Sequence, residues 1–116
     1  LIIERVNMKI YREMKKARDT RNFDTLSEFF HDDCVFVRHQ TRTSILWSDF
    51  KHDFRAMMES GKFDRLMDRC IYENDDILVE HSIMRFPDGT RKSIIIVQMI
   101  ENGKIVRMET GASKME

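Results

Sequence analysis

The sequence lacks any apolar stretch long enough to cross a bilayer, for which about 20 consecutive residues are needed. Its longest apolar run lies within 93–97 and has the length of one strand. The chain also lacks an excess of charge of one sign, because 20 Lys and Arg balance 20 Asp and Glu. Nucleic-acid binders use a basic excess to attract phosphates. We therefore expect no membrane-spanning segment and no nucleic-acid partner.

Patterns typical of metal sites and disulfides are missing as well. The two cysteines, Cys34 and Cys70, lie far apart, and the four histidines show neither HxH nor HxxxH spacing. Zinc needs three or four convergent ligands. We therefore expect no metal and no cofactor, and the isolated cysteines favour reduced, buried thiols in a cytoplasmic protein. With one proline, four glycines and no low-complexity tract, residues 1–116 are predicted to form a single domain.

What the sequence does contain is helical periodicity in its first half. Apolar residues at three- and four-residue spacing predict helices over 2–20, from 23 to about 30, and from Ser48 to just before Gly61. Asn22 is the expected N-cap of the second helix. Residues 34–39 read as a strand because they are β-branched and aromatic, and residues 40–47 are predicted to be irregular.

From residue 63 onward the pattern alternates with a period of two. It predicts strands over 63–73, 77–86, 90–100 and 104–112. Asp88-Gly89 and Asn102-Gly103 each favour a type I′ hairpin turn, in which both central residues have positive φ. Helices followed by antiparallel strands define an α+β class. We expect a cone-shaped, curved antiparallel sheet packed on three N-terminal helices, with a cavity between them.

Three segments carry a resemblance to a known family. They are the helix–break–helix ARDTRNFDTL (17–26), the segment FFHDDCVF (29–36) that leads into the first strand, and the hairpin VQMIENGKIVR (97–107). Together they resemble the SnoaL-like families of the nuclear-transport-factor-like superfamily. The resemblance implies the cone fold and an internal pocket. It does not select a reaction, because the superfamily includes isomerases, polyketide cyclases, dehydratases, epoxide hydrolases and non-catalytic binding domains.

The residues do not match the ketosteroid isomerases of that superfamily. Those enzymes use a tyrosine on the first helix, a base aspartate at the end of the first strand and a second, protonated aspartate before the last hairpin. The corresponding positions here hold Met14, Arg38 and Ile95. None of them can donate or abstract the proton, so the sequence disfavours steroid-isomerase chemistry. We also find no acidic residue that matches the single base of the SnoaL-type cyclases.

Histidine is the remaining candidate for acid–base chemistry. His81 shares the more apolar face of its strand with Ile77, Val79 and Ile83, so we expect it to point into the cavity. His39 closes the first strand, where the family places catalytic groups. A hydrogen-bonded histidine without chemistry is the alternative for both residues, and the other two, at 31 and 52, are expected on the surface.

The predicted ligand contacts are mainly apolar. Arg42 could hold a carboxylate from the loop after the first strand, and Gln98 and Arg91 are further polar candidates. The full set of expected contacts is Met14, Trp47, Phe50, Phe54, Ile83, Ile95, Val97 and Arg42.

Both faces of the strand 90–100 are apolar, whereas a half-exposed antiparallel strand has one polar face. We therefore expect a homodimer that buries the outer sheet face, which is also common in the family. Two functions remain open. One is a small-molecule-binding domain with an apolar pocket. The other is a cyclase, isomerase or dehydratase acting on a small hydrophobic substrate through His39 or His81.

Overall fold

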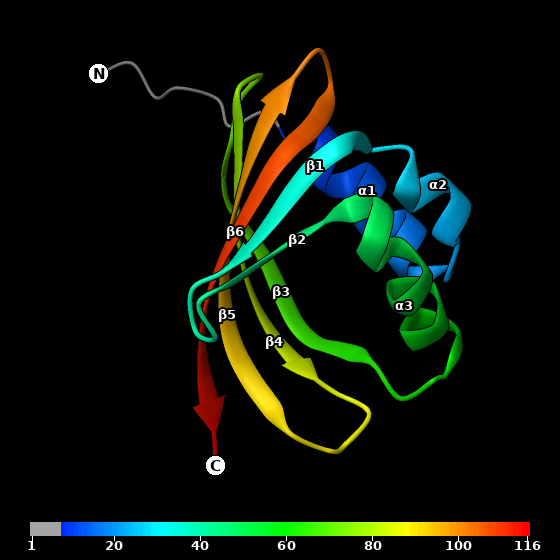
Figure 1. Cartoon of the computed structure of the whole chain (residues 1–116), viewed down its shortest axis with the longest axis vertical. Helices are drawn as coiled ribbons and strands as arrows, with labels where there is room; N and C mark the ends of the chain where they lie inside the picture. Colours follow the sequence, from blue (N-terminus) through cyan, green and yellow to red (C-terminus); the bar gives the residue numbers. More distant parts are fainter. Residues whose placement is uncertain (1–7) are drawn as a thin grey trace.

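In the computed structural model, the described residues 8–116 form three helices and six strands (Figure 1). The elements are α1 Lys9–Asp19, α2 Phe23–Ser27, β1 Phe30–Arg38, β2 Thr43–Leu46, α3 Trp47–Glu59, β3 Asp64–Glu73, β4 Ile77–Arg85, β5 Arg91–Glu101 and β6 Lys104–Met115. The first residues of the helix predicted over 2–20 lie outside the described part. The predicted α+β class is confirmed, with the helices on one side of a strongly curved sheet (Figure 1).

The six strands form one sheet in the order β2-β1-β6-β5-β4-β3. Strands β3 to β6 form the expected antiparallel meander. The sheet is nevertheless mixed, because β1 pairs in parallel with β6 when the chain returns to it at its end. Register shifts in the β1–β6, β3–β4 and β5–β6 pairs mark bulges. Bulges increase local twist and bend strands, which helps the sheet to wrap around the helices.

Several local signals give the expected structure. Asn22 caps α2 by accepting a hydrogen bond from the Thr25 amide at 3.1 Å. Gly61 follows α3 with a φ of +71°, the left-handed conformation that favours glycine. Asn102 and Gly103 have φ values of 51° and 75°, as a type I′ turn requires.

Four local predictions are wrong. The second helix, predicted to reach about residue 30, ends at Ser27, and β1 begins at Phe30 before the predicted start at 34. Residues 43–46 form β2, because backbone pairing with β1 adds a strand that the polar sequence does not reveal. Helix α3 begins at Trp47 after an extended Leu46, so Ser48 lies inside its first turn and is not the N-cap. At the β4–β5 turn only Gly89 has a positive φ, so the turn is not type I′. There the Asp88 side chain accepts from the Thr90 amide at 2.9 Å, a local bond that stabilises another turn.

The main core lies between the helices and the concave face of the sheet. Trp47 is 2% exposed, and its ring lies 4.5 Å from the ring of Phe30 and 5.5 Å from that of Phe36, centroid to centroid. Phe23 and Phe54 approach the same indole at 6.0 Å. Aromatic pairs at these separations stabilise a core beyond the area they bury. They fix the start of α3 against β1.

Strands β4 and β5 present alternate side chains to the two faces of the sheet. The concave face receives Leu78, Glu80, Ser82 and Met84 from β4 and Ile94, Ile96, Gln98 and Ile100 from β5, all of them buried. The convex face, called the outer face below, receives Ile77, Val79, His81 and Ile83 from β4 and Ser93, Ile95, Val97 and Met99 from β5. The prediction that the more apolar face of β4 points inward is therefore wrong.

Cys34 is buried, Cys70 is half-buried, and neither forms a disulfide. Burial raises the pKa of each thiol to about 11, which keeps both protonated at neutral pH. None of the helices in residues 8–116 has the length and apolarity that a membrane span requires.

Candidate ligand cavity

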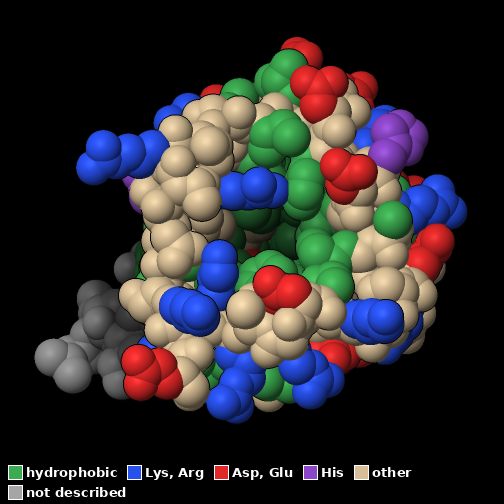
Figure 2. Space-filling view, turned by 60° about the horizontal axis from the view of Figure 1, so that its bottom comes forward, with side chains coloured by type: hydrophobic (Ala, Val, Ile, Leu, Met, Phe, Trp, Pro, Cys, Tyr) green, Lys and Arg blue, Asp and Glu red, His purple; other side chains and the backbone are tan. Residues whose placement is uncertain are grey.

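A cavity of about 320 Å³ lies between the helices and the concave face of the sheet. Figure 2 shows it as a hollow with a hydrophobic interior and charged side chains of both signs around its rim. Its apolar wall is formed by Met14, Leu26, Phe30, Phe36, Trp47, Phe50, Phe54, Met57, Phe63, Met84, Phe86, Ile94, Ile96, Met108 and Ala112. The volume is at the lower end of the range typical of small-molecule sites, and an apolar lining is typical of them.

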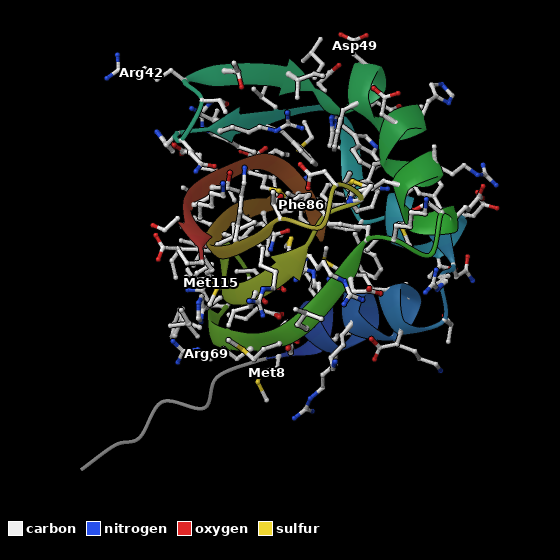
Figure 3. All side chains as sticks on the ribbon, turned by 90° about the horizontal axis from the view of Figure 1, so that it is seen from below. Met8, Arg42, Asp49, Arg69, Phe86 and Met115 are labelled. Carbon is white, nitrogen blue, oxygen red and sulfur yellow. The ribbon has the colours of Figure 1, made fainter. Side chains whose placement is uncertain are left out.

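The mouth of the cavity carries two cations that rest on aromatic rings. The guanidinium of Arg38 lies 4.8 Å from the centroid of Phe50, and the ammonium of Lys92 lies 5.4 Å from that of Phe86. Phe86 belongs to the β4–β5 turn and lies near the middle of the view from below (Figure 3). Lys92 also donates a hydrogen bond to Gln40 at 3.0 Å. Arg38 and Lys92 each therefore make a cation–π contact at the mouth.

The floor of the cavity is polar. Arg18 from α1 and Arg65 from β3 line it, with side chains 10% and 15% exposed. Behind them lies Glu80, which is 1% exposed, and its Oε1 accepts from Arg18 Nη2 at 3.5 Å and from Arg65 Nη1 at 3.2 Å. Gln98 is fully buried and donates to the other oxygen of Glu80. We call Arg18, Arg65, Glu80 and Gln98 the floor cluster.

Asp68 on β3 extends the floor cluster toward α1. Its carboxylate accepts a hydrogen bond from the Tyr11 hydroxyl and lies 3.7 Å from Arg18 Nη2. Burial opposes ionisation of Asp68, but the Tyr11 hydrogen bond and the nearby arginines outweigh it and lower the pKa. Burial and the Asp68 hydrogen bond raise the pKa of Tyr11. At neutral pH Asp68 is therefore ionised and Tyr11 is neutral.

The charged form of Arg18 is less stable than that of an exposed arginine. Burial, followed by repulsion from Arg65, lowers the pKa of its guanidinium to about 10, although Glu80 and Asp68 act in the opposite direction. Both arginines share one oxygen of Glu80. The cavity lining as a whole contains four cations, Arg18, Arg38, Arg65 and Lys92, and among the described residues no carboxylate and no histidine.

The structure brings some predicted contact residues together and separates others. Met14, Trp47, Phe50 and Phe54 line the cavity, and their role as ligand contacts stays a prediction. The expected positions of the other four are wrong. Ile83, Ile95 and Val97 lie on the outer face, where Ile95 is 42% exposed. Arg42 sits in the exposed β1–β2 turn with a φ of 55° and points away from the molecule (Figure 3).

The two candidate catalytic histidines also lie outside the cavity. His81 is on the outer face, where its Nδ1 accepts a hydrogen bond from Arg69 Nε at 3.2 Å. Its other nitrogen, Nε2, therefore carries the proton and donates to Ser93 Oγ at 2.8 Å. In this tautomer His81 cannot act as a base toward Ser93. His39 is 61% exposed and binds the Glu109 carboxylate at 2.8 Å, which lowers the pKa of Glu109.

Sequence reasoning missed the charged members of the floor cluster. Arg18 follows Met14 by four residues and thus shares its inward face of α1, a spacing visible in the sequence. Glu80 lies on the face of β4 that the apolar alternation assigned to solvent, and no face was predicted for Arg65 on β3. Among the further polar candidates, Gln98 is buried in the floor cluster, whereas Arg91 is exposed at the end of β5.

A second, more polar depression of about 710 Å³ lies at the opposite end of the sheet. It is bordered by the β3–β4 and β5–β6 turns and by the first turn of α1, and its lining includes Glu13, Glu73, Asp75, Asp76 and Glu101. Glu73 is 2% exposed and accepts hydrogen bonds from the amides of Ile10 and Tyr11 at 3.0 and 2.9 Å, so it caps α1. Within residues 8–116 no group of side chains is arranged to hold a metal ion.

Comparison with solved structures identifies the fold. No protein-family model and no curated protein sequence matches the chain. An NTF2-like protein of unknown function from Cytophaga hutchinsonii superposes with a TM-score of 0.73 at 12% identity, covering 97% of this chain and 95% of that one. A candidate ketosteroid isomerase from Kribbella flavida gives a TM-score of 0.72 at 12% identity, covering 93% and 78%.

A protein of unknown function with a cystatin-like fold from Xanthomonas campestris gives a TM-score of 0.70 at 18% identity, covering 94% of this chain and 90% of that one. These neighbours confirm the predicted fold class. The chain therefore has the NTF2-like, cystatin-like α+β fold. At such low identities the likeness extends to the fold alone.

Proposed function

We propose that the chain is a SnoaL-like domain that binds a small, largely apolar molecule in the cavity between helices and sheet. The observation that carries the proposal is the lining of this cavity of about 320 Å³, which is mainly aromatic and aliphatic. Trp47, Phe50 and Phe54 offer flat surfaces on the helix side, and Met57 and Met84 offer adaptable ones. Such a wall favours a planar or greasy ligand.

The proposal treats the domain as a binding module. An acid–base enzyme needs a proton donor or acceptor within reach of the bound molecule. The described lining contains no histidine or carboxylate, and His39 and His81 lie elsewhere. The Kribbella flavida neighbour is described as a candidate ketosteroid isomerase, so isomerase chemistry is the alternative function. Met14, Arg38 and Ile95, at the positions of the isomerase catalytic residues, do not favour it.

The binding proposal is tested by the fluorescence of Trp47, the single tryptophan of the chain. Titration with the uncharged aromatic probe 2-naphthalenemethanol is expected to quench this fluorescence in a saturable manner, because the indole lines the cavity. Ala112→Phe fills part of the cavity and should weaken binding on the order of 10-fold, a loss of about 1.4 kcal/mol.

Ala56→Phe is the matched control for that substitution. It adds the same ring to an exposed position of α3 and should bind the probe as the parent chain does. Lack of saturable quenching, or equal weakening by both substitutions, would contradict the binding proposal.

We further propose that two copies of the chain form a homodimer through the outer face. Ile77, Val79 and Ile83 lie there beside Ile95, whose exposed fraction of 42% is large for an isoleucine. A two-fold interface can bury such a patch against itself. The zero net charge of the chain leaves little overall repulsion between copies.

A further inference from the structure

We propose that the cavity selects ligands that carry a carboxylate on an apolar body, and that Arg18 and Arg65 bind this carboxylate at the cavity floor. The inference rests on the proposed binding function and specifies the ligand class. It draws on three independent features of the site: the charges that line the cavity, the state of the two guanidinium groups, and the shape of the space in front of them.

The first feature is the sign of the charges. Among residues 8–116, the four ionisable side chains that line the cavity are all cations, whereas the chain as a whole is neutral. Glu80 and Asp68, the carboxylates that pair with Arg18, are outside the lining of this cavity. A ligand in the cavity therefore meets positive groups first, and an anionic group on the ligand is attracted in a medium of low dielectric constant.

The second feature is the unused hydrogen-bonding capacity of the arginines. Arg18 uses Nη2 toward Glu80 and Asp68, and Arg65 uses Nη1 toward Glu80. Nε and Nη1 of Arg18 and Nε of Arg65 are buried, and residues 8–116 offer them no partner. An unpaired buried donor is unfavourable, more so on a charged group. These three atoms are closed off from the open cavity, so a carboxylate reaches them only when the guanidiniums turn toward it, and their planar forks then match its oxygens.

The third feature is the position of the arginines relative to the apolar wall. Arg18 lies one helical turn beyond Met14, and both side chains line the cavity. The aromatic wall around Trp47 and Phe54 completes the same space. A ligand whose carboxylate contacts the floor thus places its apolar body against the rings.

The test compares two probes that differ in one group. 2-Naphthoate carries a carboxylate where 2-naphthalenemethanol carries an uncharged hydroxymethyl group, and both are titrated against Trp47 fluorescence. A charge-assisted hydrogen bond is worth about 1.5–3 kcal/mol, so naphthoate should bind about 10-fold tighter or more. The measured quantity is the ratio of the two dissociation constants, that of 2-naphthalenemethanol over that of 2-naphthoate. Arg18→Met should reduce this ratio to about 2 or less, because the variant lacks the guanidinium that distinguishes the carboxylate from the hydroxymethyl group.

Two further variants locate the anion site. Arg38→Met removes a cation at the mouth and should leave the ratio within about 2-fold of the parent value, since the proposed carboxylate contacts are made by Arg18 and Arg65 at the floor. Glu80→Gln removes the carboxylate that competes for both guanidiniums and should raise the ratio. Arg18→Met is expected to fold, because Glu80 keeps Arg65 and Gln98 as partners. Should it not fold, Arg65→Met takes its place, since Arg18 then still pairs with Glu80.

The outcomes separate this inference from the proposed function. If neither probe binds, the binding function itself is wrong. If both bind with equal affinity, the domain binds apolar molecules but the carboxylate selection is overturned. Loss of the ratio in Arg38→Met with no change in Arg18→Met would move the anion site to the mouth and overturn the assignment to the floor. Formate titrated alone should not compete with naphthoate at micromolar concentration, because it lacks the apolar body.

Discussion

On strands β4 and β5, the buried face carries more polar groups than expected and the more exposed face carries fewer. The concave face is buried, yet it carries Glu80, Ser82 and Gln98 next to its aliphatic residues. The outer face has more access to solvent, yet most of its side chains are aliphatic, including Ile77, Val79 and Ile95. Each face therefore contains groups that the surroundings of a lone domain would not favour.

This difference supports a separate proposed interaction for each face. Buried charges are retained only where they are paired, and the floor cluster pairs two arginines with one carboxylate. Exposed aliphatic residues are stabilised when another surface covers them. The concave face is therefore suited to a small polar-ended ligand, and the outer face is suited to a second copy of the chain.

The largest expected effect comes from breaking the balance of charge on the concave face. Glu80→Gln preserves the size of the side chain but removes the negative charge between Arg18 and Arg65. Removing one partner of a buried ion pair costs about 3–5 kcal/mol, and because the amide keeps a hydrogen-bonding oxygen we expect about 3 kcal/mol. Urea denaturation measures this as a loss in the free energy of unfolding.

Glu59→Gln provides the comparison for that variant. Glu59 is 59% exposed and pairs with Arg55 on the surface of α3, so its loss should change the free energy of unfolding by less than about 0.5 kcal/mol. If Glu80→Gln were equally mild, the floor cluster would not depend on its carboxylate.

The second prediction concerns the outer face. Ile95→Lys places a charge on the proposed two-fold interface, where symmetry introduces it twice. We expect the dissociation constant of the dimer to rise on the order of 100-fold, about 2.7 kcal/mol. Light scattering at micromolar concentration should then report a mass near 14.0 kDa in place of twice that value. Ala56→Lys changes an exposed position on α3 and should leave the dimer intact.

A parent chain that is already monomeric at these concentrations would refute the dimer directly. The outer face would then be an exposed apolar surface that no second copy covers. If both Lys variants dissociate to the same degree, the added charge itself weakens association, and the outer face is not identified as the interface.

Much of the fold is predictable from the sequence because its signals are local. The period of two after residue 63, the Asn102-Gly103 turn and the Asn22 cap each depend on a few neighbouring residues. The strand β2 and the parallel pairing of β1 with β6 depend on contacts between distant segments. Local sequence patterns do not reveal such contacts. For that reason the predictions of an irregular segment over 40–47 and of an antiparallel sheet were wrong.

The candidate site is less predictable, and strand β4 explains why. Alternation in β4 divides the strand correctly into two faces but does not say which one is buried. The usual rule is that the more apolar face of a strand is buried. Applied to β4, it predicted wrongly that His81 and Ile83 point into the cavity. It fails here because Arg18 and Arg65, which come from other elements, compensate the charge of Glu80. By contrast, Trp47 and Phe54 could be assigned to the cavity side because helical spacing and aromatic character agree.

The smallest expected effect is a pH dependence on the concave side. The folded state lowers the pKa of Asp68 below its ordinary value of 3.8. Its ionised form therefore stabilises the fold above that pH, and this contribution is lost as pH falls through the lower, folded-state pKa. Asp68→Asn removes the titration. At pH 7 it should reduce the free energy of unfolding by about 1–2 kcal/mol, since a hydrogen bond from Tyr11 to the amide oxygen remains possible.

The difference between the parent chain and Asp68→Asn should shrink steadily in urea denaturations at decreasing pH below about 4. Asp19→Asn serves as the control, because Asp19 is 62% exposed in a surface pair with Lys15 and its loss should change the free energy of unfolding little. A difference for Asp68→Asn that grows as pH falls would reverse the sign. It would mean that the folded state raises the pKa of Asp68, so that burial outweighs Tyr11 and the two arginines. The concave face would then favour a neutral carboxyl group, and its resemblance to a paired ionic cluster would not extend to Asp68.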